Sequence, residues 1–115
     1  MEQHSIFTKI INREIPASIV FETDDIIVIN DISPKAPVHI LIIPKKQIAT
    51  INDIADEDIP LMGKIIATAK QVAIQLGIAD DGYRLVMNCN DFGGQTVWHL
   101  HCHMLGGKKL GWTPD

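Results

Sequence analysis

The stretch Trp98-His99-Leu100-His101-Cys102-His103-Met104-Leu105 is the most informative part of this chain of 115 residues. Successive side chains of a β-strand point to opposite faces of the sheet. A strand over this stretch therefore places three of the five histidines on one face, within about 13 Å along the strand. A uniform histidine face predicts a functional site. The opposite face is apolar, and we expect it to be core: Trp98, Leu100, Cys102 and Met104.

Three interpretations of the histidine face are open. The first is a solvated strand surface that happens to be rich in histidine. The second is a zinc site, because zinc binds imidazole nitrogens at about 2.0–2.1 Å. That site needs a bent strand so that His99 and His103 can reach one ion, and Cys102 points to the wrong face. The third is phosphate chemistry, in which one neutral imidazole attacks phosphorus and its neighbours donate hydrogen bonds to the phosphate oxygens.

A glycine-containing loop, residues 91–97, directly precedes the histidines. Gly93 and Gly94 allow the backbone to approach an anion closely. Gln95 and Thr96 add side-chain donors. Together with the three histidines, this loop favours phosphate chemistry that uses neither a metal nor a cofactor.

The motif His-φ-His-φ-His-φ-φ, from His99 to Leu105, resembles the motif of the histidine triad (HIT) superfamily. The resemblance covers nearly the whole chain, so residues 1–115 are expected to form a single HIT domain. Gly106-Gly107 after the motif is similar to the histidine triad nucleotide-binding branch and disfavours the dinucleoside polyphosphate branch. Further segments carry the resemblance: Ser5–Ile11, Glu14–Pro16, Asp31–His39, Ile42–Lys46 and Asp81–Asn88.

The resemblance implies hydrolysis of a purine nucleoside phosphoramidate or acyl-nucleotide, with release of a nucleoside monophosphate. It implies that His101 is the nucleophile, that a nucleotidyl-histidine intermediate forms, and that His99 and His39 support the nucleophile's ring. It also implies a homodimer and a purine nucleotide, an AMP or GMP conjugate, as ligand. The implied phosphate-binding residues are Asn88, Gly94, Gln95, Thr96 and His103. The implied ribose-binding residue is Asp31, and the implied base slot is formed by Phe7, Ile10 and Ile32.

Several of these residues also have an ordinary structural interpretation. His39 stands in the apolar run Val38–Ile43, where a half-buried core histidine is possible. Asp31 can cap the turn at Ser33-Pro34. Asn88 can be a turn residue at the end of a strand, and Thr96 a plain strand or turn residue. The three base-slot residues can simply belong to the core.

Hydrophobic periodicity predicts the main elements. Ile6–Ile11 is expected to be a short helix capped by Ser5. A long helix is expected over Glu57–Leu76, with Asp56 or Asp58 as its cap, Pro60 in its first turn and Gly77 as its stop. Five strands are expected: a hairpin of Ser18–Thr23 and Ile26–Asn30 turning at Asp24-Asp25, a central strand Val38–Ile43, and the last strands Tyr83–Asn88 and Trp98–Leu105.

These elements define the expected fold class. It is an α+β fold with a five-stranded antiparallel sheet, one long and one short helix, and both helices on one side of the sheet. A chain of this length with 46% hydrophobic residues can form one domain with a real core.

Composition restricts the location and the partners. The net charge of −4 argues against a nucleic-acid-binding surface. No run of about 18 apolar residues is present, so we expect no membrane span. Met1–His4 lacks signal-peptide character, and two cysteines at unrelated spacing indicate free thiols in a reducing compartment. A cytoplasmic protein is therefore expected.

Three alternative functions remain open. The chain could be a nucleotide-binding interaction or regulatory protein, although such a protein has no need of the nucleophile His101. It could be a zinc-binding protein, which metal analysis tests. It could hydrolyse dinucleoside polyphosphates, which Gly106-Gly107 disfavours.

Overall fold

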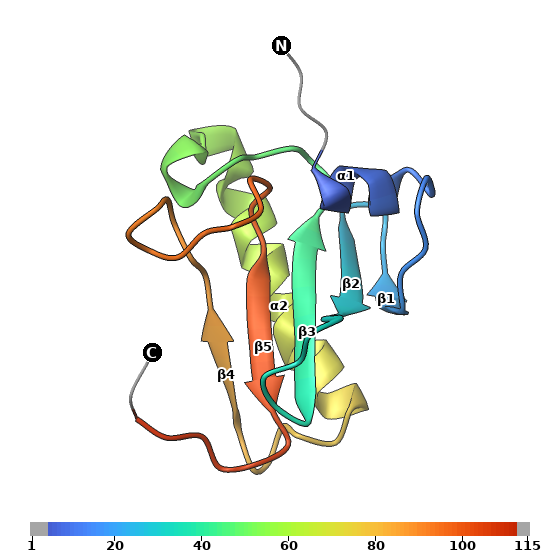
Figure 1. Cartoon of the computed structure of the whole chain (residues 1–115), viewed down its shortest axis with the longest axis vertical. Helices are drawn as coiled ribbons and strands as arrows, with labels where there is room; N and C mark the ends of the chain where they lie inside the picture. The colour runs from blue at the N-terminus through green and yellow to red at the C-terminus, as the bar shows by residue number, and fades with distance from the viewer. Residues whose placement is uncertain (1–4, 113–115) are drawn as a thin grey trace.

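A computed structural model describes residues 5–112, and within them five strands form one antiparallel sheet in the order β1-β2-β3-β5-β4 (Figure 1). This confirms the predicted α+β class and the central strand. Met1–His4, on which part of the location argument depends, lies outside the described residues. The elements in chain order are α1 (Ile6–Ile11), β1 (Ile19–Glu22), β2 (Ile26–Asn30), β3 (Val38–Pro44), 3-10 turns at Ile51–Asp53 and Asp56–Asp58, α2 (Ile59–Gln75), β4 (Tyr83–Val86) and β5 (Cys102–Gly106).

The two helices lie on opposite faces of the sheet, so the expectation that both lie on one side was wrong (Figure 1). The reason lies in β2 and β3, where Ile26–Ile29 and Ile40–Ile43 are buried without interruption. Such strands have two apolar faces, and each face needs a cover. Even-numbered residues such as Ile42 pack with α2, whereas odd-numbered residues such as Leu41 pack with Phe7 and Ile10 of α1.

α1 begins and ends as its sequence predicts. Ser5 is the N-cap, and its hydroxyl accepts a hydrogen bond from the backbone N–H of Thr8 at 3.1 Å. At the other end, Glu14 N–H donates to the carbonyl of Lys9 while Arg13 adopts φ +63°. A left-handed residue at this position is a common way to end a helix. The helix is thereby fixed at both ends above the odd-numbered face of the sheet.

α2 starts two residues later than predicted, because Asp56–Asp58 form a 3-10 turn. Asp58 occupies the N-cap position, but its carboxylate accepts from the N–H of Ala55 and makes no cap bond to α2, so the predicted capping by its side chain was wrong. Pro60 lies in the first turn and Gly77, at φ +74°, follows the helix, both as predicted. Within residues 5–112 no helix has the length and hydropathy needed to cross a bilayer.

β5 is shorter than the predicted strand and begins only at Cys102, so His99 and His101 precede it. Ladder pairing with β3 stops at Ile42 and Cys102. Beyond that pair, β3 ends at Pro44, which has no N–H to donate. The N–H of Leu100 instead donates to the carbonyl of Ile48 at 2.6 Å. The first two histidines of the motif therefore lie outside the sheet, which the chain joins only at Cys102.

The two-face prediction for this segment holds for all but one residue. Leu100, Cys102 and Met104 are buried in the core under α2, as expected. Trp98 is 47% exposed, so its assignment to the core was wrong. The physical reason is that Trp98 lies outside the regular strand, where alternation no longer decides which way a side chain points.

Candidate active site

His101 is held as a neutral ring with one defined tautomer. Its Nδ1 lies 2.8 Å from the carbonyl oxygen of His99, and a carbonyl only accepts, so Nδ1 carries the proton. Burial lowers the pKa of His101, which keeps the ring uncharged near neutral pH. The lone pair is therefore on Nε2. This is the form that a nucleophilic imidazole needs.

His99 is fully buried and makes the frame for His101. Its Nε2 lies 2.7 Å from the carbonyl oxygen of Pro44, and burial lowers the pKa of His99. The ring of Phe7 packs edge-on against both histidines, with ring centroids 6.1 Å from His99 and 4.9 Å from His101. α1 and the end of β3 thus enclose the first two histidines from opposite directions.

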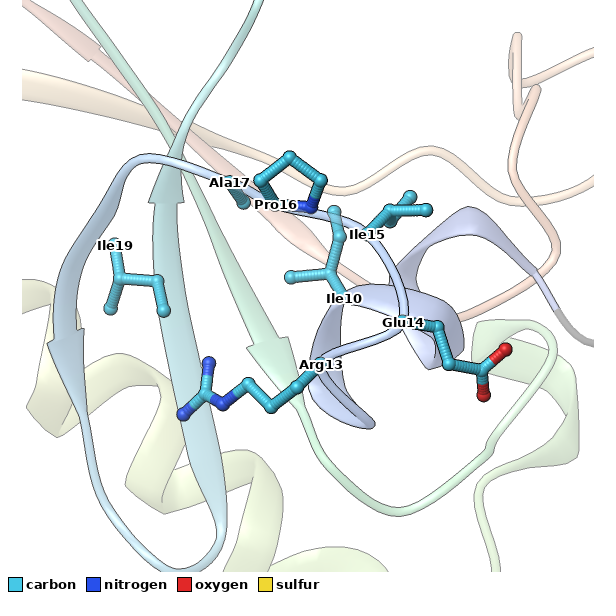
Figure 2. A pocket seen from close by; sticks show the side chains of 7 residues that line it. All are labelled: Ile10, Arg13, Glu14, Ile15, Pro16, Ala17 and Ile19. Atoms are coloured by element: carbon cyan, nitrogen blue, oxygen red, sulfur yellow. The ribbon is translucent and has the colours of Figure 1, made fainter.

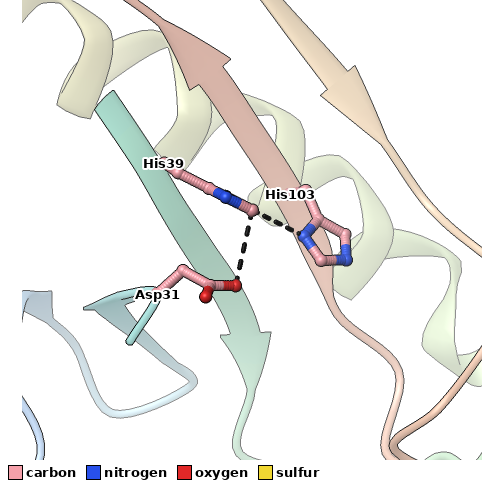
Figure 3. A group of neighbouring side chains, drawn as sticks. All are labelled: Asp31, His39 and His103. Atoms are coloured by element: carbon pink, nitrogen blue, oxygen red, sulfur yellow. Dashed lines mark hydrogen bonds and ion pairs between the residues drawn. The ribbon is translucent and has the colours of Figure 1, made fainter. Parts of the chain in front are cut away.

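His103 stands on β5 beside His39 of β3, and Figure 3 shows the two rings with Asp31. The backbone N–H of Lys35 donates to His39 Nδ1 at 3.0 Å, so the His39 proton is on Nε2. That Nε2 lies 3.0 Å from His103 Nδ1. His103 therefore accepts at Nδ1 and carries its own proton on Nε2. Burial, followed by the charges of His101 and His39, lowers the pKa of His103 to about 4, so this ring is neutral too.

Asp31 caps its turn and also contacts the histidine pair, and the ribose-binding role implied for it stays a prediction. One carboxylate oxygen accepts from the N–H of Ser33 at 2.7 Å, which caps the turn as its structural interpretation predicts. The other oxygen lies 3.4 Å from His39 Nε2. The carboxylate is thus both a turn residue and a neighbour of the histidine pair (Figure 3).

The donor chemistry of these groups argues against a metal centre. Asp31, His39 and His103 bring potential ligand atoms within 4.8 Å of one another. However, the N–H of Lys35 keeps the His39 proton on Nε2, the nitrogen that would have to bind an ion. His99 likewise uses Nε2 to donate to Pro44. The histidines are arranged as hydrogen-bonded partners rather than as a set of free lone pairs.

The glycine loop is braced from within. Asn88 Nδ2 donates to the carbonyl of Gly93 at 2.7 Å. A Cβ on Gly93 would lie 2.3 Å from the carbonyl oxygen of Cys89, so only glycine fits there. The N–H groups of Gly93, Gly94 and Gln95 all donate to carbonyls of the same loop. The loop therefore has a fixed shape before any ligand arrives.

The side chain of Gln95 is buried and serves this loop. Its Nε2 donates to the carbonyls of Ala49 and Val97 at 2.7 and 3.1 Å, and its Oε1 accepts from the N–H of Asn90 at 2.8 Å. Thr96, the next residue, is exposed. Of the two donors predicted from the loop sequence, Thr96 is free to face solvent and Gln95 is turned inward.

The three residues predicted to form the base slot differ in their exposure. Phe7 and Ile10 are buried in the cluster beneath α1, whereas Ile32 is 95% exposed. A cavity of about 390 Å³ beside α1, shown in Figure 2, includes only Ile10 of these three. The structure thus brings Phe7 against the histidines and leaves Ile32 at the surface.

Several important contacts were missed by sequence reasoning. The backbone groups of Lys35 and Pro44 set the proton positions of His39 and His99. The hydroxyls of Ser5 and Thr8 lie 3.4 Å from His99 Nδ1. Ser5 was recognised only as a cap. Backbone carbonyls and N–H groups have no sequence signature, so only the fold reveals such partners.

Comparison with known proteins identifies the family. A model of the HIT domain matches residues 12–110. The chain is 52% identical over 111 residues to the purine nucleoside phosphoramidase of Escherichia coli K12, covering 96% of this chain and 93% of that protein. It is similar to a HIT family hydrolase from Legionella pneumophila, with a TM-score of 0.94, 51% identity and coverage of 96% and 98%.

A more distant structure supports the branch suggested by Gly106-Gly107. It is the histidine triad nucleotide-binding protein of Candida albicans, with a TM-score of 0.79 and 31% identity over 96% of this chain and 84% of that chain. Gly107 is also needed sterically, because its φ is +87° and a Cβ there would lie 2.9 Å from Cβ of Pro37, whereas the nearest atom to a Cβ on Gly106 would be the flexible end of Ile78. The chain belongs to the histidine triad family.

Proposed function

We propose that this protein is a purine nucleoside phosphoramidate or acyl-nucleotide hydrolase in which His101 is the nucleophile. The observation that carries the proposal is the state of His101, a buried neutral ring whose Nδ1–H is held by the His99 carbonyl. Its Nε2 lone pair is free to attack phosphorus. The 52% identity to a purine nucleoside phosphoramidase supports the substrate class.

In the first step, His101 Nε2 attacks the α-phosphorus and the bond from phosphorus to the substrate nitrogen breaks. The nitrogen takes up a proton from solvent water and leaves as an amine, and the nucleotidyl group stays on His101; the water that attacks in the second step returns this proton to the solvent. In the second step, water attacks the same phosphorus, the bond to Nε2 breaks, and the nucleoside monophosphate is released. Two moderate steps replace one difficult displacement.

Donors around the phosphate stabilise the charge that develops on its oxygens. In this proposal His103 donates from Nε2, because His39 occupies its Nδ1. Thr96 adds its hydroxyl, and Asn88 and Gln95 act by holding the loop that carries it. Gly94 keeps that loop open to the phosphate at φ +78°. No charged side chain has to be buried for this purpose.

The nucleoside end of the substrate is proposed to lie between α1 and the turn after β2. Asp31 accepts from the ribose hydroxyls, and Ile32 closes over a purine that rests against Phe7 and Ile10. The support is chemical: a carboxylate at the edge of the histidine pair and an exposed aliphatic residue beside it. Such a slot suits either adenine or guanine.

We also propose a homodimer in the cytoplasm. Ile59, Ile66 and Ile74 are each more than half exposed and recur every seven or eight residues, so they form one apolar stripe on the outer face of α2. An exposed apolar patch of this kind marks a contact surface, and a second copy of the chain is the proposed occupant. Cys89 and Cys102 are free thiols, which suits a reducing compartment.

Steady-state hydrolysis of adenosine 5′-phosphoramidate tests the function, with wild type and His101→Ala both assayed in excess chelator. We expect wild-type turnover to persist in chelator and to disappear in His101→Ala, while AMP binding measured by calorimetry remains in the variant. Normal turnover by His101→Ala would overturn the nucleophile. Loss of wild-type activity on chelation would point to a metal-dependent reaction.

A further inference from the structure

The fully buried ring of His99 needs a hydrogen-bond donor at Nδ1. Its Nε2 donates to the carbonyl of Pro44 at 2.7 Å, and burial disfavours a charged ring, so Nδ1 is an acceptor. A buried acceptor without a partner destabilises the fold. Two hydroxyls of α1 and its cap lie at the same distance from this nitrogen, 3.4 Å: Ser5 Oγ and Thr8 Oγ1.

Gln47 decides which of the two hydroxyls donates. Its Nε2 lies 3.3 Å from the carbonyl oxygen of Trp98, which orients the amide so that Oε1 faces Thr8. Thr8 Oγ1 donates its single hydrogen to that Oε1 at 2.6 Å. The hydroxyl of Ser5 then has two acceptors in reach, Thr8 Oγ1 at 3.3 Å and His99 Nδ1 at 3.4 Å. An imidazole nitrogen is a stronger acceptor than a hydroxyl oxygen, and a buried Nδ1 has to be paired, so Ser5 donates to His99.

We infer that Ser5 is a positioning residue for the nucleophile. The hydroxyl of Ser5 fixes the ring of His99. The backbone carbonyl of His99 in turn holds Nδ1 of His101 at 2.8 Å. Ser5 thus acts on the reaction through His99 and does not touch the substrate. This inference rests on the proposed function, since it assigns Ser5 a part in the reaction of His101.

The positioning role must be separated from the capping role of Ser5, whose hydroxyl also accepts from the N–H of Thr8 at 3.1 Å. Glycine is itself a favoured N-cap residue and replaces serine there at little cost in stability. Ser5→Gly therefore removes the hydroxyl and largely preserves the helix. Ser5→Thr keeps a hydroxyl at the same position and serves as the rescue variant.

A matched control is Thr23→Ala. The hydroxyl of Thr23 also accepts backbone bonds, from the N–H groups of Asp25 and Ile26 at 3.2 and 3.1 Å, but it lies in the β1–β2 turn. With adenosine 5′-phosphoramidate we expect Ser5→Gly to lower kcat about threefold to tenfold, the value of one hydrogen bond. KM and AMP affinity should stay at wild-type values, and Ser5→Thr and Thr23→Ala should keep the wild-type kcat.

A spectroscopic measurement tests the contact without relying on turnover. In long-range ¹H–¹⁵N spectra, Ser5→Gly should shift the His99 Nδ1 resonance, and Thr23→Ala should leave it unchanged. The inference is overturned if Ser5→Gly retains the wild-type kcat, or if kcat falls while His99 Nδ1 does not shift. An inactive wild type with the expected Nδ1 shift would instead refute the proposed function and leave the contact in place.

Discussion

The carbonyl oxygen of Pro44 lies 2.7 Å from Nε2 of His99, so the last residue of β3 holds the first histidine of the His99–His103 motif. Proline has no N–H, and the β3–β5 ladder ends two residues before it. The segment that precedes β5 therefore lies outside the sheet, and its His99 and His101 rings pack against Phe7 of α1. The end of β3 therefore determines where the first two histidines lie.

Removing the ring of His99 should destabilise the protein strongly. His99→Ala leaves a cavity and an unpaired carbonyl in a fully buried position, and we expect a loss of about 2–4 kcal/mol in the free energy of unfolding. His99→Gln can still donate to Pro44 and should lose less. Urea denaturation of both variants measures the difference, and equal losses would show that the bond to Pro44 contributes nothing.

The acid limb of the pH–rate profile should lie below the ordinary histidine pKa of 6.5. Burial lowers the pKa of His101, so its Nε2 lone pair persists as the pH falls through 6.5. Activity is lost only when the ring is finally protonated, because a protonated imidazole has no lone pair to attack with. The measurement is kcat/KM against pH, which reports the free enzyme. A limb at or above 6.5 would contradict the neutral buried nucleophile.

Replacing Arg13 by glycine should stabilise the protein relative to replacing it by alanine. Arg13 already bears the strain of φ +63°, a conformation that glycine adopts freely and residues with a Cβ do not. The ion pair of Arg13 with Glu22 is exposed and contributes only about 0–1 kcal/mol. We therefore expect Arg13→Ala, which keeps the strain and loses the ion pair, to be slightly less stable than wild type, and Arg13→Gly to be more stable than Arg13→Ala by about 1 kcal/mol. Thermal unfolding of the two variants should rank them in that order.

Gly93→Ala should lower activity by distorting the glycine loop. The new Cβ would meet the carbonyl of Cys89 at 2.3 Å, so the loop has to move away from the position that Asn88 and Gln95 brace. We expect a loss of kcat on the order of tenfold or more, because small displacements near reacting groups are costly. Gly111→Ala, where a Cβ meets nothing within 4 Å, is the control. Equal activity of the two variants would show that the loop adapts.

Ile66→Glu should convert the proposed dimer into monomers. The side chain stands in the middle of the apolar stripe on α2, and a charge there would be buried without a partner in a dimer. Light scattering after size exclusion gives the mass of wild type and variant. Gln75→Glu, at an exposed α2 position on another side of the helix from the stripe, should remain dimeric. A monomeric wild type would refute the dimer.

Much of the fold was predictable because periodicity and caps are local. The short helix, the hairpin, the central strand and the stop at Gly77 all follow from such signals. The placement of α1 opposite α2 was not predicted, although the uninterrupted burial of Ile40–Ile43 carried the signal. The start of β5 at Cys102 depends on Pro44, which lies 58 residues earlier in the sequence. The ends of such strands are determined by contacts between residues far apart in the sequence.

The candidate site, like the fold, was predictable from the sequence only in part. The sequence identified the histidines, because their spacing is regular and their chemistry is distinctive. Their proton positions depend on a backbone N–H of Lys35 and carbonyls of Pro44 and His99, which every sequence contains. Gln95 was expected to face the phosphate, yet its amide fills the interior of its loop. Residue type indicates what chemistry is available, and the fold decides where it is used.

The opposite placement of the two helices makes β3 serve two purposes with alternate residues. His39 and Leu41 face the histidines, whereas Ile40 and Ile42 face the core under α2. Because side chains alternate, a slip of β3 by a single residue would exchange the two sets completely. Such a slip would move Ile40 and Ile42 to the face beneath α1 and would move His39 away from His103, into the core under α2. Catalytic activity in this protein is therefore also a measure of correct strand register.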